Sequence, residues 1–125
     1  MSIYVPTSLG ELVDKITILT IKNKMLSDDD KLLYVRSELN LLSDILEDTG
    51  IDVPETLYQK LHSINLSLWK LEDDIREKEK RLDFGEDFIE MARSIYQTND
   101  ARSFIKKQIT DLDKNSIVQE QKGYV

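Results

Sequence analysis

Two stretches of the chain repeat apolar side chains in alternating steps of three and four residues, the period of a helix that packs against another helix. The positions are Leu32, Val35, Leu39, Leu42 and Leu46 in the first stretch, and Leu57, Leu61, Ile64, Leu68, Leu71 and Ile75 in the second. Apolar seams of this kind are buried when helices pack side by side at a small angle. The chain is therefore expected to fold as a helical bundle.

The segment from residue 16 to 21 reads ITILTI and, taken alone, is typical of a strand because nearly all of it is β-branched. Its neighbours predict a helix instead. Ser8 and Glu11 have the spacing of a capping box, and apolar residues continue at helical spacing from Leu9 onward. We expect a central helix over residues 8–25, apolar around much of its circumference and covered by partners on more than one side.

Acidic, glycine and proline residues mark the ends of the next two helices. The second helix is expected to begin at residues 27–30, with Ser27 as a candidate cap and the carboxylates of residues 28–30 at the positive end of the helix dipole. It is expected to stop at Gly50. The third is expected to run from Pro54 to about residue 82. That length exceeds the average for helices of globular proteins.

The fourth helix has two interpretations. Capping residues at 97–100 favour a break there, followed by a restart. The alternative is one long helix that reaches Leu112. We favour a kink or a restart at 97–100.

The chain ends differ from the helical middle. Residues 2–5 and 116–125 are each expected to be short extended segments, which are able to pair with each other. The prediction is an all-α fold: an antiparallel bundle of four to five helices with a long third helix and short extended N- and C-terminal segments. Residues 1–125 are expected to form a single helical domain.

Composition limits the classes of function. A formal charge of −7 argues against nucleic-acid binding, which relies on a positive surface. The chain has no cysteine, which excludes disulfides and fits a reducing compartment. No apolar run approaches the roughly 20 residues that span a bilayer, and the start of the chain lacks the features of a signal peptide. We expect a cytoplasmic protein with no nucleic-acid or membrane partner.

A polar stripe lies beside the apolar seam of the third helix. In steps of four and three it contains Tyr58, His62, Asn65, Trp69, Glu72 and Arg76. In one interpretation a polar ligand is bound by four of these side chains, with Trp69 as a stacking surface; the four are His62, Asn65, Glu72 and Arg76. In the other the stripe is a polar ladder that fixes the register of the helices.

The sequence NDARSFIKK gives a second group of polar candidates, namely Asn99, Asp100, Arg102 and Lys106, with Arg93 a turn or two upstream. A helix beginning here would offer an anion site made of free amides and arginine. The alternative is a helix cap with ordinary surface cations.

Carboxylates spaced by three residues on a helix suggest a metal site. Glu11 and Asp14 have this spacing, and Glu72 lies on the third helix. Acidic residues on facing helices are able to hold Mg²⁺ against a phosphorylated ligand. With 24 acidic residues in the chain, such spacings also arise by chance.

Four segments together resemble a small family of uncharacterised proteins from bacteria and their phages, known by a domain-of-unknown-function label. They are VPTSLGELVDKITILTIKNKM, NLSLWKLEDDIREKE, DFIEMARSIYQTNDARSFIKKQI and SIVQEQKGY, and they span nearly the whole chain in order. The departures are mild: Thr20 where an acidic residue is common, Met91 where leucine is expected, and Gln121 where glutamate is usual. The resemblance implies no activity.

Two functions remain from different classes. The first is a non-enzymatic module that self-associates, most simply as a homodimer, or binds a partner protein. The second is a small enzyme or binding protein for an anionic ligand, either phosphorylated or a sugar nucleotide. Only the second would use Mg²⁺ as a cofactor.

Overall fold

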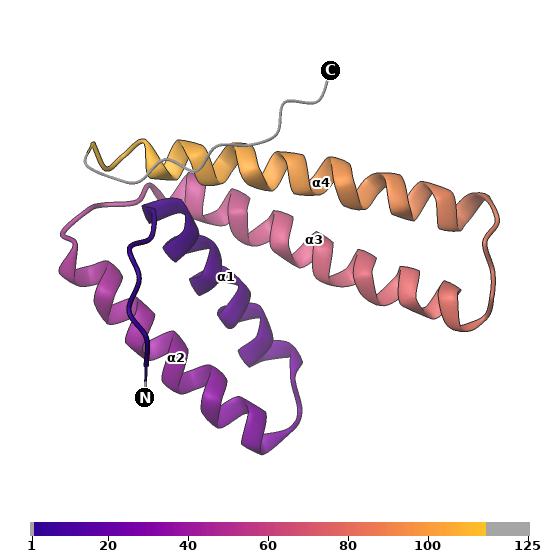
Figure 1. Ribbon diagram of the computed structural model, residues 1–125, viewed down its shortest axis with the longest axis horizontal. Helices are drawn as coiled ribbons and strands as arrows, with labels where there is room; N and C mark the ends of the chain where they lie inside the picture. Colours follow the sequence, from indigo (N-terminus) through magenta and orange to yellow (C-terminus); the bar gives the residue numbers. More distant parts are fainter. Residues whose placement is uncertain (1, 115–125) are drawn as a thin grey trace.

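The computed structural model describes residues 2–114, and all regular secondary structure in them is α-helical. This part of the chain contains four helices: α1 (Leu9–Met25), α2 (Asp29–Asp48), α3 (Glu55–Lys80) and α4 (Glu86–Thr110) (Figure 1). The predicted all-α class is confirmed, and so is the long third helix, which has 26 residues. The expected pairing of terminal segments involves residues 116–125, which lie outside the described residues.

The segment ITILTI lies within α1 and is helical, as its neighbours predicted. The Ser8 hydroxyl accepts a hydrogen bond from the backbone N–H of Glu11 at 3.2 Å and so caps the helix. Burial outweighs the low helix propensity of β-branched residues here, since Val13 and Thr17 are fully buried. The Thr17 hydroxyl donates to the backbone carbonyl of Asp14 at 2.7 Å, so its burial leaves it satisfied.

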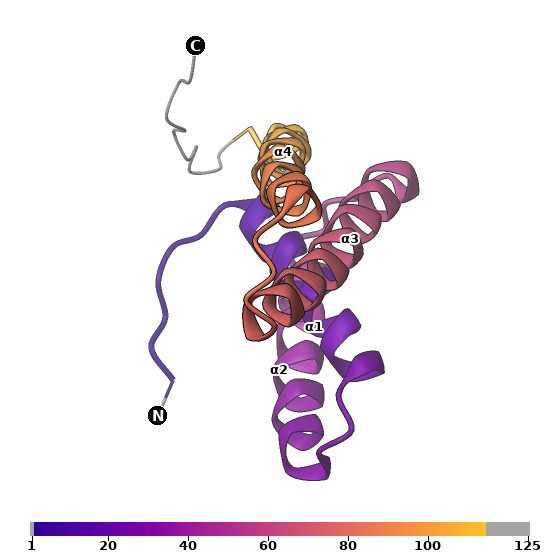
Figure 2. The same cartoon turned by 90° about the vertical axis from the view of Figure 1, so that its right-hand side faces the viewer.

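The four helices form two hairpins, α1 with α2 and α3 with α4, and the second hairpin packs on α1. Figure 1 shows α1 with α2 and α3 with α4 as the two pairs, the members of each pair running in opposite directions. α1 contacts all three other helices, whereas α2 contacts only α1. Figure 2 shows α2 on the outside of the molecule, away from α4. The prediction that α1 is central is confirmed, and α2 is left with a large open surface.

The apolar core lies where the N-terminal parts of α1 and α3 meet the C-terminal part of α4. Its buried residues are Leu9, Val13, Leu61, Ile105 and Ile109. Fully burying a side chain of this size contributes about 1.5–3 kcal/mol. Within residues 2–114, no helix combines the length and the apolar character that a bilayer crossing requires.

α4 is one continuous helix, so the predicted break at residues 97–100 is wrong and the alternative of a single helix is correct, although it ends at Thr110. Asn99 and Asp100 are good capping residues, but a cap stabilises a chain only where backbone amides are free. α4 lies along α3 through this stretch (Figure 1). Packing of the two helices therefore keeps the backbone helical.

An ion pair at the surface joins the end of α3 to the turn before α4. Lys78 Nζ donates a hydrogen bond to Asp83 Oδ2 at 3.1 Å, and the Gly85 backbone N–H donates to Asp83 Oδ1 at 3.4 Å. The hydrogen bond from Lys78, followed by that from Gly85, lowers the pKa of Asp83. The bond with Asp83 likewise raises the pKa of Lys78.

We expect the pKa of Asp83 to lie below 3.8 and the Lys78→Met variant to return it toward that value. Because the folded-state pKa is lowered, the pair stabilises the fold fully above the unfolded-state pKa. This contribution is lost as the pH falls through the folded-state pKa. The effect on stability should be small, since the pair is at the surface. NMR titration of the carboxyl group measures the pKa, with Lys80→Met as the control, and an unchanged Asp83 pKa in Lys78→Met would contradict the assignment.

Candidate functional site

A buried carboxylate lies where α1, α3 and α4 meet. Asp14 of α1 is 3% exposed. Arg102 of α4 donates two hydrogen bonds to it, from Nε to Oδ1 at 2.9 Å and from Nη2 to Oδ2 at 2.5 Å. Asn65 of α3 donates another, from Nδ2 to Oδ1 at 2.9 Å. Three helices are thus joined through one aspartate.

Thr17 completes this network. Asn65 Nδ2 also donates to Thr17 Oγ1 at 2.7 Å, and the Thr17 hydroxyl donates to the Asp14 carbonyl. No buried side-chain nitrogen or oxygen in residues 2–114 lacks a hydrogen-bond partner. A buried charge is tolerated when it is paired and hydrogen-bonded, and this closed network explains how α1 accommodates an aspartate among apolar residues.

Further contacts join α1 to α4. Lys106 Nζ forms an ion pair with Glu11 and lies 4.0 Å from Asp14 Oδ2. The Gly10 backbone N–H donates to Thr110 Oγ1 at 2.9 Å. A Cβ atom at position 10 would lie 2.2 Å from the carbonyl oxygen of Lys106, so the two helices approach this closely only because residue 10 is glycine.

The pKa of Arg102 is raised above its ordinary value, chiefly by its hydrogen bond with Asp14, while burial opposes the rise. The negative charges of Asp14, Glu11 and Glu72 also raise it. Arg102 therefore remains cationic, and it contributes a fixed positive charge and N–H donors rather than acid–base chemistry.

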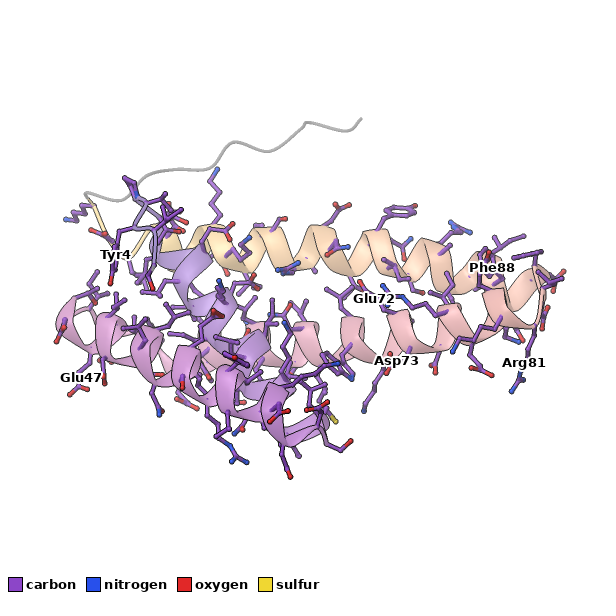
Figure 3. The ribbon with its side chains drawn as sticks, turned by 60° about the horizontal axis from the view of Figure 1, so that its bottom comes forward. Tyr4, Glu47, Glu72, Asp73, Arg81 and Phe88 are labelled. Atoms are coloured by element: carbon purple, nitrogen blue, oxygen red, sulfur yellow. The ribbon has the colours of Figure 1, made fainter. Side chains whose placement is uncertain are left out.

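A cavity of about 140 Å³ opens beside this network. Its polar lining comes from residues that the sequence analysis singled out, namely Asn65, Trp69, Glu72, Asn99 and Arg102. Ile18, Ile21 and Leu68 supply the apolar lining. Figure 3 shows Glu72 on the side of α3 that faces α4. Two stripes of candidates on different helices thus converge on one cavity.

The remaining ligand candidates lie elsewhere. Arg76, Arg93 and Asp100 are exposed and do not line this cavity. Arg93 Nη1 lies 3.7 Å from Glu90 Oε1 on the same helix, an ordinary surface pair. Lys106 is engaged by Glu11 instead of facing the cavity.

The three proposed metal ligands are separated by their partners. Glu11 pairs with Lys106 and Asp14 with Arg102, while Glu72 lines the cavity. Among residues 2–114, no three histidine or acidic side chains come together as metal ligands would. The geometry therefore gives the magnesium hypothesis no support.

Sequence reasoning missed Gly10, Thr17 and Thr110, which take part in the contacts between helices. Thr17 and Thr110 carry no local signal of these contacts, because Asn65 and Gly10, their partners on other helices, lie far away along the chain. Gly10, in contrast, carries a local signal. A glycine within a helix lowers its stability by about 1 kcal/mol relative to alanine, and a close approach of another backbone is a common reason to find one.

The described residues also enclose two cavities with largely different linings. The larger, about 630 Å³, lies between α3 and α4, and Ile64, Phe104 and Ile105 contribute to its largely apolar lining. The other, about 370 Å³, is lined in part by His62 and Lys24. The single histidine thus lines a different cavity from Asn65, although it lies one helical turn away from it on α3.

Residues 3–125 match the model of a family described as "Family of unknown function (DUF6165)". This match confirms the resemblance to a family of unknown function. No curated protein and no solved structure matches the chain.

Proposed function

The chain belongs to a family of unknown function, and we propose from its geometry that it is a helical interaction module that binds a partner protein through the exposed face of α2. One observation supports this most directly: α2 carries a second apolar stripe on a surface that contacts no other helix of residues 2–114.

The second stripe consists of Tyr34, Leu41 and Ile45, which are 80%, 47% and 38% exposed. Spacings of seven and four residues place these side chains on one face of the helix. At 3.6 residues per turn, this face lies about a third of a turn from the seam that packs on α1. An apolar stripe of this kind on an open helix is a typical docking surface for another helix.

The negative charge of α2 favours a basic partner over a second copy of this chain. Residues 28–48 contain seven acidic and two basic side chains, a formal charge of −5 out of −7 for the whole chain. Two copies packed through α2 would bring these negative charges together, whereas lysine and arginine beside an apolar stripe would complement them. The proposed partner is therefore an amphipathic helix whose apolar face is flanked by basic residues.

We expect a designed helical peptide with a leucine seam flanked by lysine and arginine to bind, and the Leu41→Ser/Ile45→Ser variant to bind about 30-fold more weakly. Each replaced side chain is already partly buried, so its loss should remove about 1 kcal/mol of apolar contact. Isothermal titration calorimetry measures the affinity, and NMR shift changes locate the peptide on the protein.

Leu33→Ser is the matched control, because Leu33 is 63% exposed on the same helix but lies outside the stripe. Its affinity should stay within about twofold of the original. A peptide with glutamate at the flanking positions should not bind. Equal binding of both peptides would contradict the proposal. So would a dimer, measured by light scattering, that dissociates in the stripe variant, because the occupant would then be a second copy.

A further inference from the structure

The cavity beside Asp14 contains hydrogen-bonding groups that the fold does not use. Trp69, Glu72 and Asn99 line it and form no side-chain hydrogen bond or ion pair with any of residues 2–114. The Nδ2 of Asn65 donates to Asp14 and Thr17. Its Oδ1 is therefore the atom that can accept a hydrogen bond from a ligand. The cavity thus presents both donors and acceptors.

The charges around the cavity disfavour a charged ligand. The guanidinium of Arg102 is already neutralised by Asp14, and Lys106 by Glu11. An incoming anion would meet the carboxylate of Glu72, which forms no ion pair within residues 2–114. An incoming ammonium group carries only hydrogen-bond donors, so it would leave the N–H groups of Trp69 and Asn99 without an acceptor. A neutral ligand with several hydroxyl groups avoids both conflicts, because each hydroxyl can donate to a carboxylate and accept from an N–H group.

The size of the cavity suits a ligand group of about one ring. Its volume of about 140 Å³ is close to the roughly 150 Å³ of a cavity known to hold benzene. Ile18, Ile21 and Leu68 offer apolar surface for the C–H groups of such a ring. We propose that the cavity lined by Trp69, Glu72 and Asn99 binds a neutral sugar ring, either a free monosaccharide or the end of a glycan.

Trp69 makes a direct test available, because it is the single tryptophan of the chain. Titration with a panel of neutral hexoses, pentoses, N-acetylated sugars and short glycans should change its fluorescence in a saturable way for at least one sugar. The same sugar should raise the melting temperature. An amino sugar and a sugar phosphate of the same ring should bind at least about tenfold more weakly.

Two variants place the sugar in this cavity. Glu72→Ala should weaken binding by about tenfold or more, because it removes an acceptor of hydroxyl hydrogen bonds. Asp73→Ala is the matched control, since it removes a neighbouring exposed carboxylate that does not line the cavity, and its affinity should be unchanged. The proposal is overturned if no neutral sugar changes the fluorescence, if the charged sugars bind more tightly, or if the two variants behave alike.

Discussion

Replacing Gly10 by alanine should lower the free energy of unfolding by about 3 kcal/mol, the upper part of the range for overpacked sites. The new Cβ would lie 2.2 Å from the Lys106 carbonyl oxygen and 2.5 Å from Thr110 Oγ1. A backbone carbonyl cannot move aside like the end of a flexible side chain. α1 and α4 would therefore have to separate, and the hydrogen bond from Gly10 to Thr110 would be lost.

The direction of this effect is what makes it informative, since Gly→Ala within a helix ordinarily stabilises by about 1 kcal/mol. Urea denaturation of the variant measures the change. Gly85→Ala is the matched control, because its Cβ would meet nothing nearer than Asp83 Oδ1 at 3.5 Å. Since Gly85 is the N-cap of α4, this variant should lose no more than about 1 kcal/mol. A stabilised or unchanged Gly10→Ala variant would show that α1 and α4 do not approach each other as described.

The second large effect is expected at Asp14, where Asp14→Asn should destabilise the protein by about 3 kcal/mol. The substitution keeps the size of the side chain but leaves the Arg102 guanidinium, which is only partly exposed, without its counter-charge. The new amide would also present an N–H group to the donors of Arg102 and Asn65. The loss of stability should be near the lower end of the range for broken buried ion pairs, because 28% of the Arg102 side chain is exposed.

A double variant shows whether the loss of stability comes from the unpaired charge of Arg102 or from the absence of the Asp14 side chain itself. In Asp14→Leu/Arg102→Met both charges are gone, and Asn65 keeps its hydrogen bond to Thr17. Its stability should return to within about 1 kcal/mol of the original, because an apolar pair of similar volume can replace a buried ion pair. Arg93→Met, which breaks the exposed pair with Glu90, should change stability by less than about 0.5 kcal/mol. If the stability losses of the single variants Asp14→Leu and Arg102→Met simply add up to the loss in the double variant, the two residues do not form a pair.

Local signals predicted the helices well. The capping box at Ser8 and the periodicity after it located α1, and the leucine seams located α2 and α3. They could do so because a helix is specified by neighbours within a few residues. The break proposed at 97–100 shows the limit of this reasoning. Capping residues there favour a helix start locally, and contacts of α4 with α3 decide the outcome.

The candidate site was predicted in part, because helical spacing shows which residues share one face of a helix. Helical spacing placed Asn65, Trp69 and Glu72 on one face, and the structure brings that face to Asn99 and Arg102. Arg76 continues the stripe in sequence but does not line the cavity. In Figure 1, α1 does not extend along the C-terminal part of α3, to which Arg76 belongs. The pairing of Arg102 with Asp14, 88 residues away, has no local signal at all.

The central position of α1 has a consequence for the order of folding. α1 is synthesised first, yet its partners α3 and α4 come last, and the hydrogen bond from Gly10 to Thr110 joins residues 100 positions apart. Of the described helices, only α2 can cover α1 before α3 is made, and the surface of α1 that packs on α4 stays uncovered until α4 has left the ribosome. Such late, long-range closure slows folding and favours aggregation of partly made chains. The nascent chain should therefore depend on chaperones more than its small size suggests.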